Sequence, residues 1–291
     1  MKIKDILIKI PEGDNKKTVL QILNEKLCLS KNAVKNLKFH GKILVNKEKV
    51  TVRYELKTGD ELFLSFYEKP SENIEPENIP LDILYEDENI LAVNKMSSMP
   101  THPSQNNRSK TLANAVMGYF DKKGEQLTFR ALNRLDKYTS GVVIIAKNAV
   151  SAAAVSKTLK NAKKTYIAVL TNPPGTDSGK ITAPIGRCGG SIIKRTVRPD
   201  GKYAETHYKI LKRKNSLALA EIKIKTGRTH QIRVHMSYIG SAVYSDFLYG
   251  EEIKGVRMML HCKSIEFLNP FTDKIQTISA PVRDEIIKMF D

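Results

Sequence analysis

The hydrophobic and polar positions of this chain of 291 residues follow two different patterns, one before and one after about residue 80. Over residues 16–27 the apolar side chains recur at helical spacing, and Ser30 is a suitable N-cap for a second helix that ends before Gly41. Two short apolar runs follow, bounded by turn residues. The pattern predicts helices over 16–27 and 30–39, a strand at 43–45, a turn at 46–47 and a strand at 61–66.

After about residue 80 the pattern changes to short runs rich in β-branched residues, with few helical stretches between them. Strands are predicted at 90–93, 141–146, 166–170, 204–211, 217–224 and 258–261, and helices at 111–120, 149–161, 230–238 and 281–289. Because many of these strands adjoin one another in sequence, we expect an α+β fold built on a mixed, largely antiparallel sheet.

Charge marks the boundary between the two patterns. Residues 71–90 contain seven acidic residues and neither Lys nor Arg, and three prolines lie at positions 70, 76 and 80. Such a segment cannot continue a helix and would be repelled by a nucleic acid. We therefore predict a small α/β domain over residues 1–70, an acidic linker over 71–80 and a larger domain over 81–291.

Composition narrows the class of partner. A formal net charge of +17 favours a phosphate-rich partner or an anionic membrane surface. The membrane is the weaker alternative, because the first ten residues mix charge with apolar side chains and no apolar run approaches bilayer length. The three cysteines form no Cys-x-x-Cys pair. We expect a cytoplasmic, monomeric protein with reduced thiols.

The first domain resembles the S4 RNA-binding domain. The resemblance rests on the order helix, helix, hairpin, on Gly-x-Ile-x-Val-Asn at 41–46 and on Lys-Thr-Gly-Asp at 57–60. From charge alone its lysines could equally form a solvated face, but the domain pattern favours RNA binding. The lysines predicted to contact RNA are Lys31, Lys35, Lys38 and Lys42.

One carboxylate in the second domain is a candidate for catalysis. Asp136 lies on a turn just before an apolar strand, in Arg134-Leu-Asp followed by Thr139-Ser-Gly. Loops that precede strands often carry functional groups, but most aspartates there only form the turn. Position alone therefore favours a structural role for Asp136.

The surrounding motifs resemble the RluA-type pseudouridine synthases. That family's signature, His-Arg-Leu-Asp-x-x-Thr-Ser-Gly, matches residues 133–141 at every fixed position except the first, which is Asn133. Further motifs follow in the family's order, and together they cover about residues 81–285. These motifs are found at 90–95, 100–103, 164–168, 226–235, 249–250, 260–261 and 269–270.

The resemblance implies an RNA isomerase that needs neither cofactor nor metal. Conversion of uridine to pseudouridine breaks the glycosidic C–N bond and joins C5 to the same sugar carbon. The reaction requires an ionised carboxylate shielded from water and a positive partner for it. The resemblance implies that Asp136 is the nucleophile, attacking the sugar or the pyrimidine ring, with Arg233 as its partner. It places Tyr166 and Leu260 on opposite sides of the base. It also makes Tyr166 a candidate to assist removal of the C5 proton, a role that requires its own proton to be relayed or its pKa to be lowered.

The remaining implied site residues serve the substrate. Because a paired base is inaccessible, the uridine must leave its stack, and Arg134 either fills the vacated space or contacts a phosphate. Arg228, His230 and Gln231 position RNA or brace the loop. Asn133 cannot become cationic as the family's His can, so it could alter substrate preference. A second departure lies at Ala242 and Ser245, where the family has Pro and Gly, and it puts the local turn in doubt.

Alternative functions remain at this stage. The RNA is ribosomal, as favoured for members with an S4 domain, or transfer RNA. A non-catalytic RNA-binding or ribosome-assembly protein would have no use for Asp136, Tyr166 and Arg233 together. A metal-dependent hydrolase lacks an obvious set of metal ligands around His230 and His235. Gly189-Gly190 matches no nucleotide-binding loop and predicts a hairpin turn.

Overall fold

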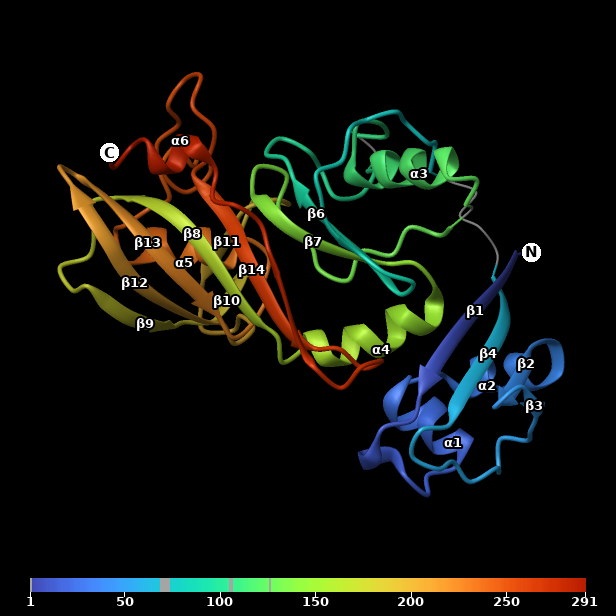
Figure 1. Ribbon diagram of the computed structural model, residues 1–291. Coiled ribbons are helices and arrows are strands. Elements are labelled where there is room, and N and C mark those ends of the chain that lie inside the picture. Colours follow the sequence, from blue (N-terminus) through green and yellow to red (C-terminus); the bar gives the residue numbers. More distant parts are fainter. Residues whose placement is uncertain (1, 69–73, 105–106, 126) are drawn as a thin grey trace.

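The computed structural model describes residues 2–68, 74–104, 107–125 and 127–291 (Figure 1). At the N-terminal end, β1 (Lys2–Lys9), β4 (Glu61–Glu68), β2 (Lys42–Val45) and β3 (Glu48–Lys49) form an antiparallel sheet in that order. Strand β1 was not predicted. Its signal is a period of two, with Ile6 and Ile8 buried and Leu7 59% exposed between them.

The two predicted helices of this domain are present with different regularity. Helix α2 (Lys31–His40) begins as predicted, with the Ser30 hydroxyl accepting from the Ala33 amide. The first helix is shorter than predicted. It comprises α1 (Val19–Gln21) and the π-helical turn η2 (Ile22–Lys26), where the Leu27 amide bonds to the Ile22 carbonyl five residues back. A 3₁₀ turn, η1 (Glu12–Asp14), precedes them.

The second body is the predicted α+β domain with a mixed sheet. Its strand order is β5-β6-β7-β14-β8-β13-β12-β9, and β15 pairs with β14. Strands β7 and β14 run parallel to each other. The strands are β5 (Ile83–Glu86), β6 (Ile90–Lys95), β7 (Ser140–Ala146), β8 (Lys163–Thr171), β9 (Ser178–Thr182), β12 (Glu205–Lys214), β13 (Leu217–Ile224), β14 (Leu260–Leu268) and β15 (Ile275–Ser279). β14 extends well beyond the predicted 258–261.

The predicted helices of this domain are confirmed, with shifts of a few residues at their ends. They are α3 (Leu112–Lys122), α4 (Ala149–Leu159), α5 (Gln231–Tyr238) and α6 (Asp284–Ile287). A separate hairpin pairs β10 (Ile185–Arg187) with β11 (Arg195–Val197), as the glycines at 189–190 predicted. None of the helices in the described ranges has the length and apolarity needed to span a bilayer.

Helix α4 joins the two bodies (Figure 1). Val150 and Ala154 on α4 pack into the N-terminal core, and the Lys157 ammonium donates to the Glu25 carbonyl at 2.5 Å. Lys26 bridges Asp14 at 2.6 Å and Asp273, beyond β14, at 2.7 Å. Of the predicted linker, residues 71–73 lie outside the described residues. Glu77 hydrogen bonds through its backbone to Asn114 in α3, and the domain boundaries remain a prediction.

Candidate active site

Asp136 lies on a turn that leads into β7, at the centre of the large sheet. The turn closes through the Thr139 amide, which donates to the Asp136 carbonyl at 3.1 Å. Upstream, the Asn133 side chain accepts from the Ile144 amide at 2.8 Å and donates to the Val142 carbonyl at 3.0 Å. Both polar ends of Asn133 therefore bind the backbone of β7, and the structure does not bring this side chain to the pocket.

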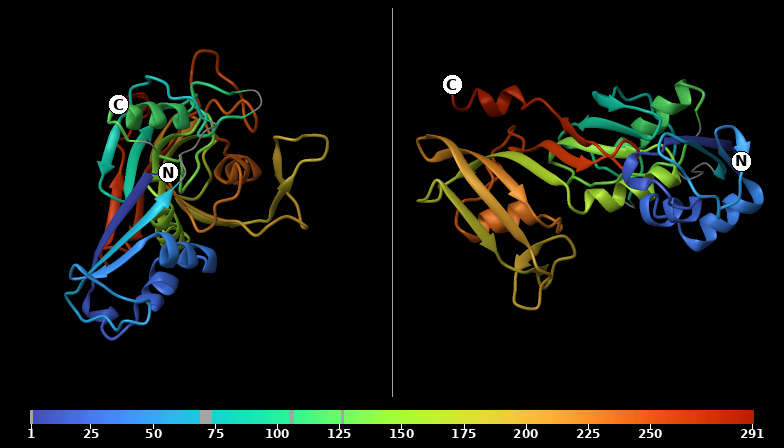
Figure 2. Two further views of the ribbon diagram at one scale, coloured as in Figure 1. Left: turned by 90° about the vertical axis from the view of Figure 1, so that its right-hand side faces the viewer. Right: turned by 60° about the horizontal axis from the view of Figure 1, so that its bottom comes forward.

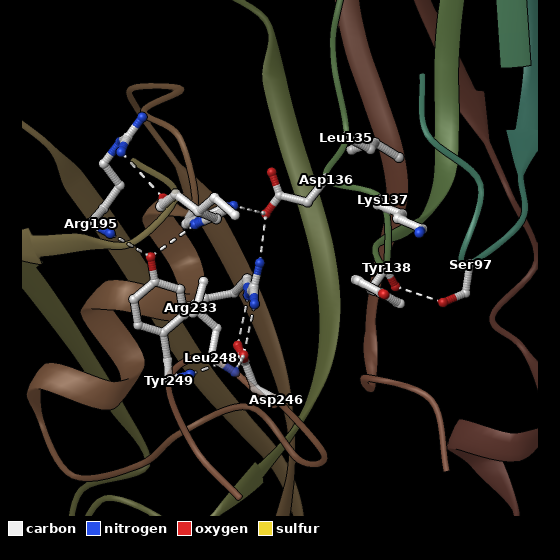
Figure 3. A network of polar contacts seen from close by, with 12 residues as sticks. Ser97, Leu135, Asp136, Lys137, Tyr138, Arg195, Arg233, Asp246, Leu248 and Tyr249 are labelled. Carbon is white, nitrogen blue, oxygen red and sulfur yellow. Dashed lines mark hydrogen bonds and ion pairs between the residues drawn. The ribbon is translucent and has the colours of Figure 1, made fainter. Parts of the chain in front are cut away.

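Three side chains from the end of β6 and the segment after it hold the Asp136 turn from one side, and Figure 3 shows one of them, Ser97. Lys95 donates to the Lys137 carbonyl at 3.2 Å, Ser97 to the Tyr138 carbonyl at 2.8 Å and Thr101 to the Leu135 carbonyl at 3.1 Å. The carbonyls on both sides of Asp136 are thus bound. We call Lys95, Ser97 and Thr101 the carbonyl clamp, since it fixes the backbone from which the carboxylate projects.

Lys95 is the most deeply buried member of the carbonyl clamp, with 1% of its surface exposed. Its ammonium also donates to the carbonyls of Met96 at 2.9 Å and Met99 at 2.7 Å, so all three N–H groups are used. Burial lowers the pKa of Lys95 to about 7, and the nearby charge of Asp136 opposes this shift.

Arg233 of α5 holds the carboxylate from the other side. Its guanidinium is bidentate to Asp246, with Nε to Oδ2 at 2.7 Å and Nη2 to Oδ1 at 2.8 Å, and its Nη1 reaches Asp136 Oδ2 at 3.4 Å. Burial disfavours the charge on Arg233, but Asp246 and Asp136 outweigh it, so the pKa of Arg233 is raised. Arg233 therefore stays cationic behind a carboxylate that is 27% exposed to the pocket.

A short chain of contacts continues from Asp136 to β11 (Figure 3). His230 Nε2 is 3.9 Å from Asp136 Oδ2, too far for a hydrogen bond, and its Nδ1 lies 2.8 Å from the Tyr249 hydroxyl. Tyr249 in turn accepts from the Arg195 amide at 2.8 Å. Burial lowers the pKa of His230, so its imidazole is neutral at neutral pH.

Tyr166 and Leu260 enter the same pocket from neighbouring strands. Tyr166 on β8 pairs with Cys262 on β14, and Leu260 pairs with Ala168, so both side chains come from the β14–β8 ladder. The pocket has a volume of about 90 Å³. It is lined by every predicted site residue of the catalytic domain except Asn133, namely Arg134, Asp136, Tyr166, Arg228, His230, Gln231, Arg233 and Leu260.

Burial constrains the proton chemistry of Tyr166. Its pKa is raised well above the usual value, first by burial and then by Cys262 and Asp136. The Cys262 thiol is buried as well, and burial raises its pKa to about 12. Both groups keep their protons at neutral pH, so neither is poised to accept one.

Gln231 and Arg228 brace the loop that precedes α5. The Gln231 amide accepts from the Thr226 hydroxyl and the Arg228 backbone, and it donates to the Glu205 carbonyl and the Thr206 hydroxyl. Arg228 donates through Nε to the Tyr203 carbonyl at 2.9 Å. Arg134 is exposed at the pocket mouth.

The turn at 240–246 is kept despite the two departures from the family pattern. Ser245, at the family's glycine position, has a φ of 58°, a left-handed conformation that glycine adopts more easily. Its hydroxyl donates to the Val256 carbonyl at 2.7 Å and accepts from the Ile253 amide at 3.2 Å. These bonds offset the backbone strain and keep Asp246 beneath Arg233.

The sequence did not identify five residues of this arrangement as functional: Lys95, Ser97, Thr101, Asp246 and Tyr249. A usable signal existed for Lys95, a lysine that closely follows the apolar run at 90–93. Asp246 was given no role, because its pairing with Arg233 depends on how α5 packs. Among the described residues, no three His, Cys, Asp or Glu side chains are grouped as metal ligands.

Comparisons with known proteins agree with this geometry. The family model of RNA pseudouridylate synthase matches residues 89–238, and that of the RluD ribosomal pseudouridine synthase N-terminal domain matches residues 6–62. The solved structure of human RNA pseudouridylate synthase domain containing 1 is similar, with a TM-score of 0.62 and 25% identity, over 75% of this chain and 89% of that one.

Two curated relatives extend over almost the whole chain. An uncharacterized RNA pseudouridine synthase of Bacillus subtilis, YjbO, is 38% identical over 90% of this chain and 95% of its own length. The ribosomal large subunit pseudouridine synthase D of Vibrio parahaemolyticus is 32% identical over 89% and 85%. With the catalytic motifs gathered around one pocket, these matches show that the chain belongs to the RluA-type RNA pseudouridine synthases, isomerases that act on RNA.

Proposed function

We propose that this protein converts uridine to pseudouridine in large-subunit ribosomal RNA, with Asp136 as the nucleophile and without a cofactor. The observation that carries the proposal is the Asp136 carboxylate, which is open to the pocket on one side and backed by the buried cation of Arg233 on the other. Attack by a carboxylate requires both the ionised form and a fixed direction of approach.

Residues that line the pocket have separate roles in the isomerisation. Asp136 attacks the uridine, the glycosidic C–N bond breaks, and the detached base turns so that C5 bonds to the same sugar carbon. The bond between Asp136 and the substrate then breaks, which returns the free carboxylate. The hydrogen that leaves C5 is balanced by the one that N1 gains. Tyr166 and Leu260 hold the base during its rotation. Since the Tyr166 phenol stays protonated, we assign it to the wall of the pocket and not to the role of general base.

The pocket admits only a base that has left its stack. The cost of extruding a base is a few kcal/mol, and it is smallest where the nucleotide is already unpaired. Arg134 is exposed at the pocket mouth, where a planar cation can occupy the vacated space or bind a phosphate.

The N-terminal domain adds affinity through charge. Lys31, Lys35, Lys38 and Lys42 are exposed on or next to α2. Each phosphate contact made by such a lysine strengthens binding and makes it more sensitive to salt. The choice of large-subunit ribosomal RNA is supported by the names of several relatives, such as the Vibrio parahaemolyticus enzyme.

The test is a map of pseudouridines in total RNA from cells with and without the gene. Complementation with the wild-type chain should restore specific sites in large-subunit ribosomal RNA, and complementation with Asp136→Asn should not. Sites that change only in transfer RNA would overturn the choice of substrate. A map unchanged by deletion, with the purified protein still binding RNA, would favour the non-catalytic alternative.

A further inference from the structure

The hairpin of β10 and β11 projects from the body of the catalytic domain (Figure 2). Its tip, residues 188–194, carries two adjacent isoleucines whose side chains face solvent. Ile192 is 83% exposed and Ile193 60% exposed. Two neighbouring apolar side chains at this exposure cost free energy in water and serve no packing role in the described chain.

The tip has an ordered internal structure. One nitrogen of the Arg195 guanidinium, Nη1, shares its two hydrogens among the carbonyls of Ile192 at 3.3 Å, Ile193 at 3.2 Å and Lys194 at 3.3 Å. The Ser191 hydroxyl accepts from the amides of Ile193 and Lys194, at 3.3 and 3.0 Å. Because these bonds fix the backbone of residues 192–194, the isoleucine side chains are held outward.

The hairpin surrounds its apolar tip with positive charge. Arg187 and Lys194 are exposed, and neither pairs with a carboxylate in the described part of the chain. Arg198 is paired with Asp200 near the base of the hairpin. An apolar tip flanked by cations that have no carboxylate partner is complementary to nucleic-acid bases flanked by phosphates. A protein partner with a basic surface would be repelled by the same cations.

The end of β11 next to the tip is connected to the active site. The Arg195 amide donates to Tyr249, whose hydroxyl contacts His230, and His230 faces Asp136 across 3.9 Å (Figure 3). The same residue, Arg195, therefore orders the tip through its side chain and attaches the hairpin to the pocket wall through its backbone.

We propose that Ile192 and Ile193 form an apolar wedge that packs against unstacked bases of the substrate RNA beside the target uridine. Apolar side chains inserted between base steps are a known way to unstack and bend a nucleic acid. The wedge would thus favour the distorted RNA from which the uridine enters the pocket. This inference rests on the proposed function, and it adds a surface that acts on the neighbours of the uridine.

The test compares Ile192→Ser/Ile193→Ser with Ile275→Ser, a matched control in which an isoleucine 65% exposed on β15 is changed. The probe is an unmodified transcript of bacterial large-subunit ribosomal RNA, free of protein. We expect the double variant to bind the transcript about tenfold more weakly and to lose at least about tenfold in kcat/KM. This is the loss expected when one or two contacts to bases are removed. The control should match wild type, and the thermal midpoint of both should be unchanged.

Salt dependence separates the wedge from its charged neighbours. Removing apolar side chains should leave the slope of log affinity against log salt unchanged. Arg187→Ala/Lys194→Ala should flatten that slope by roughly 0.7–0.9 for each phosphate that the protein no longer neutralises. Equal binding and turnover by the double variant and wild type would overturn the wedge. So would an equal loss in Ile275→Ser, or a flattened slope in the double variant.

Failure of the wedge and failure of the proposed function give different results. If the wedge is wrong, the double variant still makes pseudouridine at the wild-type rate. If the proposed function is wrong, the wild-type chain makes none, while the binding comparison can still be carried out.

Discussion

The Asp136 site and the lysines on and next to α2 both depend on charge. The charges that support Asp136 are buried and paired, whereas the lysines are exposed. In the pocket, Arg233 and Asp246 are 2% and 0% exposed and are joined by two short hydrogen bonds. The four lysines predicted to bind RNA, three on α2 and Lys42 at the start of β2, are exposed, and none has an ion-pair partner among the residues described.

This difference teaches which kind of change each region tolerates. A buried charge acts through fixed geometry, so removing its partner disturbs folding and the direction of the nucleophile together. An exposed lysine acts through its contribution to the positive electrostatic potential of the surface. Its removal therefore lowers the affinity for RNA by a small amount that depends on salt. Substitutions in the two regions should therefore move different measured quantities.

The largest effect is expected for Asp246→Asn. This change leaves the buried Arg233 without its charged partner, and it should lower the free energy of unfolding by roughly 3–5 kcal/mol. Chemical denaturation of the purified protein measures this loss. The control is Asp200→Asn, which breaks the exposed pair with Arg198 and should leave the unfolding midpoint unchanged. Equal midpoints for both variants would show that the buried pair does not anchor the site.

Lys95→Met should act on catalysis more than on binding. Without the ammonium, the carbonyls of Lys137, Met96 and Met99 lose their donor and the Asp136 turn loosens. We expect kcat to fall by about 100-fold with little change in KM, as for a misplaced reacting group. Lys163→Met, at a lysine 77% exposed, is the control. If Lys95→Met kept the wild-type kcat, the Lys95 contacts of the carbonyl clamp would not contribute to catalysis.

The same residue predicts a pH dependence of stability. The pKa of Lys95 is about 7 in the folded chain and near 10.4 when unfolded, so the unfolded chain binds more protons between these values. Stability contributed by this group must then rise with pH across that window. Relative to Lys95→Met, the wild type should gain about 3 kcal/mol in free energy of unfolding between pH 7 and 9.5. If the free energy of unfolding did not rise in this way, the pKa of Lys95 would not be lowered in the folded chain.

A smaller effect is expected on the basic face of α2. Lys31→Ala/Lys35→Ala should raise KM for ribosomal RNA by about tenfold at physiological salt and leave kcat unchanged. The slope of log affinity against log salt should flatten as well. Lys214→Ala, at an exposed lysine ending β12, serves as the control. A fall in kcat without a change in the slope would show that α2 does not act through phosphate contacts.

The smallest effect is expected for Ser245→Gly. Glycine relieves the left-handed strain at this position but removes the hydroxyl that bonds to Val256 and Ile253. The two contributions are each about 1 kcal/mol and opposite in sign, so the free energy of unfolding should change by less than about 1 kcal/mol. A large loss in thermal denaturation would mean that the hydroxyl bonds dominate at this turn.

The sequence predicted the fold class and most of the pocket, for identifiable reasons. The catalytic motifs are local, so Asp136 and its turn could be read directly, and eight of the nine site residues predicted for this domain do line one pocket. Asn133 is the exception. A short amide can bind either RNA or a neighbouring strand, and only the path of β7 beside it decides the matter.

What could not be predicted depends on contacts between distant segments. The carbonyl clamp joins residues 95–101 to the turn at 135–138, and Asp246 reaches Arg233 from a loop after α5. Such pairings leave no periodic pattern in the chain. Strand β1 was missed for a different reason, because its charged residues obscured an alternation that only the buried side makes clear.

The most direct test of the central claim is single turnover of purified wild-type and Asp136→Asn protein on an unmodified large-subunit ribosomal RNA transcript, with the dissociation constant measured in parallel. Asparagine keeps the shape of the side chain and removes its nucleophilic charge. The account predicts that Asp136→Asn binds the transcript within about threefold of wild type and forms no detectable pseudouridine. Product formation by Asp136→Asn at a rate near that of wild type would contradict it.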